Sequence, residues 1–121
     1  MNEILFRLLA IAEMCKELHY RFIRVYELHL LYDRFYDDVK DERDALNEAM
    51  LAEGLEVPTA SENLGGAMAL IPDEVTWETL KEVVDGTLAI INGYDTGSSR
   101  GLNKVLDDIA GKLFDIKAFL Q

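Results

Sequence analysis

Two pairs of polar residues, each with a spacing of four, lie in the stretch 27–50, "ELHLLYDRFYDDVKDERDALNEAM". His29 precedes Asp33 in the first pair, and Asp44 precedes Glu48 in the second. Residues four apart on an α-helix lie on the same face, one turn above the other. A mixture of imidazole and carboxylate groups suits iron, manganese or zinc better than calcium or magnesium. Each pair could therefore hold one cation between adjacent helical turns.

The two pairs lie too far apart along one helix to share an ion, because 11 residues span roughly 16 Å. Two copies of the helix, packed antiparallel about a two-fold axis, would bring His29 and Asp33 of one chain opposite Asp44 and Glu48 of the other. A two-fold interface repeats each contact, so a dimer would have two equivalent metal sites. His19, on the core side of the preceding helix, could add a nitrogen ligand. The alternative is a charged face that contacts only water, with His19 as a core histidine.

The elements that must position these residues follow from the hydrophobic pattern. Residues 2–53 contain no Gly or Pro, and their apolar residues recur at steps of three and four, which is typical of amphipathic helices. A single helix of this length would extend roughly 75 Å, so we expect a turn. Residues 21–26 are its expected place, because β-branched and aromatic residues there are poor helix formers.

The second half of the chain predicts two further long helices after a long connection. Both prolines lie within residues 54–75, where we expect a crossover with a short helix around 62–70. Thr76 is a candidate N-cap for a helix that reaches about Asn92, and Ser98 or Ser99 can cap a last helix. The fold class is therefore all-α, with the outline of a ferritin-like four-helix bundle that has one long crossover.

Composition narrows the functional classes. A chain of 121 residues predicts a single domain over 1–121. Its formal net charge of −11 argues against binding to DNA by long-range electrostatic attraction, and it suits a cationic partner. The single cysteine, Cys15, excludes an internal disulfide, and we interpret it as a small buried hydrophobe. There is no basic lead-in to a secretory signal and no membrane-spanning apolar run, so we expect a cytoplasmic protein without a membrane partner.

The segment "LHYRF…ELHLLYDRFYDDVKDERDALNEAM" resembles the signature of the Dps-type mini-ferritins. In that family a His-aromatic pair ends the first helix, and a His followed four residues later by Asp opens the second. An Asp and a Glu, four apart, follow on the same helix. The five ligand positions of the family fall on residues of the expected types: His19, His29, Asp33, Asp44 and Glu48. The tail "DTGSSRGLNKVLDDIAGKLFDIKAFLQ" is similar to the family's last helix.

The resemblance implies an iron-storage ferroxidase, an oxidoreductase assembled as a dodecameric shell from two-fold dimers. Members bind Fe²⁺ between two subunits, oxidise it with peroxide or oxygen and keep the ferric mineral inside, which limits oxidative damage. His19, His29 and Asp33 would come from one chain and Asp44 and Glu48 from its partner. Zinc or manganese could replace iron at such donors. In the family, iron enters near the last helix, where this chain has three acids: Asp95, Asp107 and Asp108. The alternative is that these are ordinary acids, which are favourable near the N-terminus of a helix.

The sequence departs from the family at the turn between the first two helices. His19 and His29 are 10 residues apart, fewer than usual, and "RFIRVY" replaces the usual Gly-Pro turn, which can move His19 out of ligand range. Tyr20 stands where the family usually has Trp, and no lysine-rich tail is present for DNA binding. Two alternatives remain open: a ferritin-like assembly protein without effective ferroxidase activity, and a helical module whose acidic face binds a basic partner.

Overall fold

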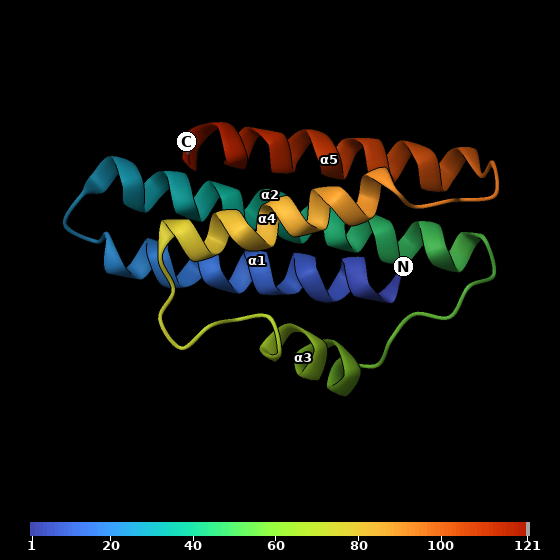
Figure 1. Cartoon of the computed structure of the whole chain (residues 1–121), viewed down its shortest axis with the longest axis horizontal. Helices are drawn as coiled ribbons and strands as arrows, with labels where there is room; N and C mark the ends of the chain where they lie inside the picture. Colours follow the sequence, from blue (N-terminus) through green and yellow to red (C-terminus); the bar gives the residue numbers. More distant parts are fainter. Residues whose placement is uncertain (121) are drawn as a thin grey trace.

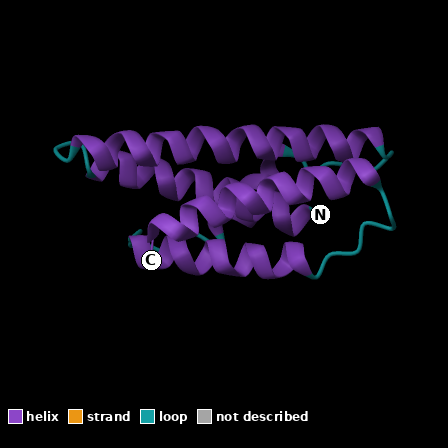
Figure 2. Ribbon diagram, turned by 90° about the horizontal axis from the view of Figure 1, so that it is seen from above, coloured by secondary structure: helices purple, strands orange, loops and turns teal. Residues whose placement is uncertain are grey.

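The computed structural model of the chain describes residues 1–120, which form five helices and no strand (Figure 2). In chain order the helices are α1 (Asn2–Arg21), α2 (Tyr26–Ala52), α3 (Ala60–Met68), α4 (Trp77–Asn92) and α5 (Arg100–Leu120). The all-helical class predicted from the hydrophobic periodicity is confirmed. Within residues 1–120, no helix combines the length and the apolar character that crossing a membrane requires.

The four long helices form a bundle with one long crossover (Figure 1). α1 and α2 make one antiparallel hairpin, and α4 and α5 make another. The end of α2 and the start of α4 lie at opposite ends of the bundle, so the connection between them runs back along its length and carries α3. α4 therefore runs in the same direction as α2. Around the core the packing order is α1, α2, α5, α4, and each long helix is antiparallel to both of its neighbours.

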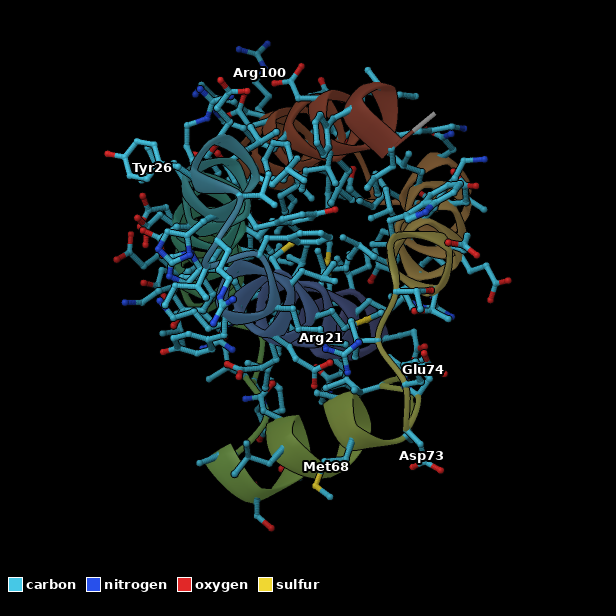
Figure 3. All side chains as sticks on the ribbon, turned by 90° about the vertical axis from the view of Figure 1, so that its left-hand side faces the viewer. Arg21, Tyr26, Met68, Asp73, Glu74 and Arg100 are labelled. Carbon is cyan, nitrogen blue, oxygen red and sulfur yellow. The ribbon has the colours of Figure 1, made fainter. Side chains whose placement is uncertain are left out.

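The core lies between the four long helices, where side chains from all of them fill the interior (Figure 3). Leu8 and Ile11 of α1, Leu46 of α2 and Leu113 of α5 are fully buried. Burial of each such side chain contributes about 1.5–3 kcal/mol to the free energy of folding. The buried side chains of α2 therefore determine which of its faces remains on the outside of the bundle. The outer face of α2 is the one that carries the candidate metal ligands.

The chain reverses between α1 and α2 at residues 22–25, within the stretch where a turn was predicted. The carbonyl oxygen of Leu18 accepts a hydrogen bond from Phe22 N at 3.0 Å, and that of Phe22 accepts one from Val25 N at 2.9 Å. The Phe22 ring stacks on Tyr32 of α2 with 5.7 Å between the ring centroids. Backbone hydrogen bonds and an aromatic contact thus close this turn without Gly or Pro.

The helix in the crossover begins earlier than its apolar residues predicted. Thr59 and Glu62 form a capping box: the Thr59 hydroxyl accepts from Glu62 N, and the Glu62 carboxylate accepts from Thr59 N. These hydrogen bonds lower the pKa of Glu62. The box fixes the start of α3 at Ala60, whereas the sequence predicted 62–70, because apolar spacing locates a buried face better than a helix end.

The two later caps are where the sequence predicted them. The Thr76 hydroxyl accepts a hydrogen bond from Thr79 N at 3.2 Å, which caps α4. The Ser99 hydroxyl accepts one from Leu102 N at 3.3 Å at the start of α5, so Ser99 rather than Ser98 is the cap. Ser98 instead has a positive φ of 71° within the loop.

α3 lies outside the bundle and packs only on α1 among the long helices (Figure 3). Gly66 allows this approach, because a Cβ at that position would overlap the ring of Phe6. The neighbouring Gly65 has open space around the place of its missing Cβ. Gly66 therefore serves helix packing, whereas Gly65 is not required for it.

Candidate metal centre

The first candidate ligands are brought together by the α1–α2 hairpin. His19 lies in the last turn of α1 and His29 in the first turn of α2. Their rings are stacked, with 3.6 Å between centroids and an interplanar angle of 18°. The short "RFIRVY" turn thus places the two imidazoles face to face instead of separating them. His19 is buried at 9 % exposure, and His29 is half-buried.

The two histidines hold each other through reciprocal hydrogen bonds. His19 Nδ1 lies 2.6 Å from the carbonyl oxygen of His29, and His29 Nδ1 lies 2.6 Å from the carbonyl oxygen of His19. A carbonyl oxygen can only accept, so each Nδ1 must carry the hydrogen. In the neutral imidazole, Nε2 then keeps its lone pair and can bind a cation. We call this arrangement the histidine clasp.

Asp33 lies one helical turn beyond His29 and completes what we call the histidine half: His19, His29 and Asp33. Its Oδ1 is 4.0 Å from His19 Nε2. The same oxygen accepts a hydrogen bond from Lys16 Nζ of α1 at 3.2 Å. Sequence reasoning did not identify Lys16, because nothing in the spacing of the two residues reveals a contact across the hairpin.

The carboxylate pair, Asp44 and Glu48, lies farther along α2, and both residues are exposed. Within residues 1–120, no hydrogen bond or ion pair joins this pair to the histidine half. Nor is any group of three or more His, Cys, Asp or Glu side chains in that part of the chain, His19, His29 and Asp33 included, placed so that it could hold a metal ion by itself. The hairpin therefore unites His19, His29 and Asp33 but leaves the two carboxylates of the predicted set apart from them.

The outer face of α2 carries more than the candidate ligands. Tyr26 and Leu51, near its two ends, are 70 % and 59 % exposed. The end-on view shows Tyr26 pointing away from the bundle (Figure 3). Asp37 and Lys40, near the middle, are also exposed. We call this face, which also holds His29, Asp33, Asp44 and Glu48, the α2 stripe.

The acids predicted for iron entry are divided between two places. Asp95 lies in the loop before α5, where its Oδ1 accepts a hydrogen bond from Gly97 N at 2.8 Å. Asp107 and Asp108 lie on α5 and line an open hollow with Glu42 of α2. Burial, with the nearby charge of Asp108, raises the pKa of Glu42. The structure thus brings Asp107 and Asp108 together, leaves Asp95 in a turn, and adds Glu42 to the acidic group.

The histidine half can offer imidazole nitrogens and a carboxylate oxygen, a donor set that fits iron, manganese or zinc. Its clasp fixes the tautomer of both rings before any cation arrives, which is the usual task of hydrogen bonds behind a metal ligand. Within residues 1–120 these three side chains do not form a metal site by themselves, so a bound cation would need further ligands from another chain. No model of a known family, no curated protein and no solved structure matches the chain.

Proposed function

We propose that the protein is a ferritin-like ferroxidase, which binds ferrous iron at sites shared by two chains and stores it in oxidised form. The observation that carries this proposal is the histidine clasp, which engages Nδ1 of both rings and leaves His19 Nε2 directed toward Asp33, 4.0 Å from its Oδ1. The bundle with its single long crossover is the connectivity of ferritin-like folds and gives further support.

The pattern of the α2 stripe supports a two-fold dimer. In the antiparallel register that brings the histidine half opposite the partner's carboxylate pair, residues whose numbers add to 77 face each other. His29 then faces Glu48 of the other chain, and Asp37 faces Lys40. At each end of the stripe, the exposed Tyr26 of one chain covers the exposed Leu51 of the other. The register that builds the metal sites thus also pairs opposite charges and buries apolar side chains.

The same register brings Asp33 opposite the other chain's Asp44. Two carboxylates facing each other repel unless a cation lies between them. In the proposed dimer that cation is the substrate, Fe²⁺, and each dimer has two such positions. The imidazoles and carboxylates hold and orient it, and the carboxylates favour the more highly charged ferric product. The oxidant is peroxide or oxygen, and the redox change occurs at the metal. The mineral would collect inside a shell built from such dimers.

The proposal is tested by an anaerobic ferrous iron titration followed by addition of peroxide. The wild type is compared with Asp44→Ala/Glu48→Ala. The matched control is Asp73→Ala/Glu74→Ala, which also removes one Asp and one Glu. Both control residues are exposed in the connection before α4, away from the α2 stripe (Figure 3).

We expect rapid growth of ferric absorbance in the wild type and in the control, and growth at the buffer rate in the Asp44/Glu48 variant. Loss of the rapid phase in both variants would assign the effect to net charge. Oxidation at the buffer rate in all three proteins would refute the ferroxidase proposal.

A second candidate function is a ferritin-like assembly protein without effective ferroxidase activity. The contact between Lys16 and Asp33 favours it, because an ammonium group already neutralises one candidate ligand. It predicts a shell-sized mass in solution, with no rapid iron oxidation in the same titration.

A further inference from the structure

Lys16 occupies a distinctive position beside the proposed iron site. Its ammonium group is 3.2 Å from Asp33 Oδ1, the same oxygen that lies 4.0 Å from His19 Nε2. It also lies over two aromatic rings, 4.7 Å from the centroid of Tyr36 and 5.6 Å from that of Tyr20. A carboxylate and two aromatic ring faces all attract a cation, so the position of the Lys16 ammonium group favours positive charge.

A metal ion bound by His19 Nε2 and Asp33 Oδ1 would compete with the ammonium group for the same carboxylate oxygen. Lysine carries a compact charge on a flexible stem, so it can leave a carboxylate by rotating. The structure offers room for this movement. Lys16 borders an open hollow of about 270 Å³ between α1 and the connection before α4, lined also by Ile71, Val75 and Glu13. Glu13 is three residues away on the same helix, where it can pair with a displaced lysine.

We propose that Lys16 is a resident counter-cation of the Asp33 carboxylate, which an incoming metal ion must displace toward the hollow beside Glu13. Lys16 is then the residue that sets the metal affinity of the histidine half, and it neutralises Asp33 while no metal ion is bound. This inference rests on the proposed function only in taking Asp33 as a metal ligand. It concerns cation binding and not the oxidation step.

The test uses Co²⁺ as the probe, because its visible absorbance reports nitrogen and oxygen ligands without a redox change. Binding of Co²⁺ to the whole chain is followed by absorbance and by calorimetry. The variants are Lys16→Met, which keeps an unbranched side chain one atom shorter and removes the charge, and Lys16→Arg, which keeps the charge. Lys104→Met is the matched control, since it also removes a lysine from an ion pair, with Asp108 on α5. Circular dichroism verifies that each variant keeps its helices.

We expect Lys16→Met to bind Co²⁺ at least about tenfold more tightly than the wild type. Lys16→Arg and Lys104→Met should bind no more tightly than the wild type. If Lys16→Met binds Co²⁺ as the wild type does, or more weakly, the counter-cation inference is wrong while a metal site still stands. Equal tightening in Lys104→Met would also overturn it, because the cause would be net charge.

Two further outcomes separate this inference from the proposed function. Co²⁺ binding by Lys16→Met but not by the wild type would support the counter-cation role and refute metal binding as the native function. If no variant binds Co²⁺, both proposals are refuted. Should Lys16→Met lose its helices, Lys16→Gln provides the uncharged side chain with a polar end, and the same outcomes apply.

Discussion

The central contact of the proposed dimer can be tested by exchanging charges. Asp37 of one chain should face Lys40 of the other across the two-fold axis, and the contact occurs twice. An exposed ion pair contributes about 0.5 kcal/mol, and reversing one charge replaces attraction by a repulsion of similar size. Each single reversal, Asp37→Lys or Lys40→Asp, should therefore weaken the dimer by about 2 kcal/mol, or about 30-fold in Kd. The double exchange should restore association.

The two single variants separate this contact from an effect of overall charge. Asp37→Lys changes the formal net charge from −11 to −9, and Lys40→Asp changes it from −11 to −13. If only mutual repulsion of acidic chains mattered, the first variant would associate more tightly and the second less tightly. The proposed register predicts that both single variants associate more weakly than the wild type. It also predicts that the difference in Kd between each variant and the wild type becomes small at about 1 M salt, where the Debye length is only about 3 Å.

Sedimentation equilibrium over a range of concentrations measures these dissociation constants. Opposite signs for the two single variants, or a double exchange no better than either of them, would refute the register. The metal sites would then need another arrangement of the two chains.

Two further predictions concern the packing on α1. Burial raises the pKa of Cys15 to about 12, so at pH 8 only about one thiol in ten thousand is ionised. Alkylation of this thiol by iodoacetamide should therefore be very slow in the folded chain and fast in urea. Equal alkylation rates in the two states would contradict the burial of Cys15. Gly66→Ala should lower the free energy of unfolding by about 1–3 kcal/mol through overlap with Phe6. The control Gly65→Ala should raise it by up to about 1 kcal/mol, and a urea titration that gave both variants the same sign would refute the contact.

The long helices could be predicted because their apolar residues recur with the helical period over three or more turns. The turn at residues 22–25 was also located, since Phe22 and Val25 interrupt an otherwise favourable helix. The start of α3 was missed because a capping box, and not an apolar face, defines it. Thr59 with Glu62 has the sequence signature of such a box, so this signal was present in the chain.

The candidate site was only half predictable. The spacing of four residues predicted that the two members of each pair on α2 share one face, because helical geometry determines this. The histidine clasp depends on how two helices meet across a turn, and backbone carbonyl groups supply half of its contacts. Lys16 reaches Asp33 across the same hairpin, from 17 residues away in sequence. Contacts of this kind follow from tertiary packing, which the local pattern of residue types does not specify.

The separation of the two groups along α2 has a genetic consequence. If each iron site takes its imidazoles from one chain and the carboxylates of Asp44 and Glu48 from another, no single chain contains a complete site. A subunit defective at Asp44 and one defective at His29 would each be inactive alone. Combined in one dimer, they would form one fully defective site and one site built entirely from intact residues. Two loss-of-function alleles could thus rescue each other, whereas two alleles that damage the same group could not.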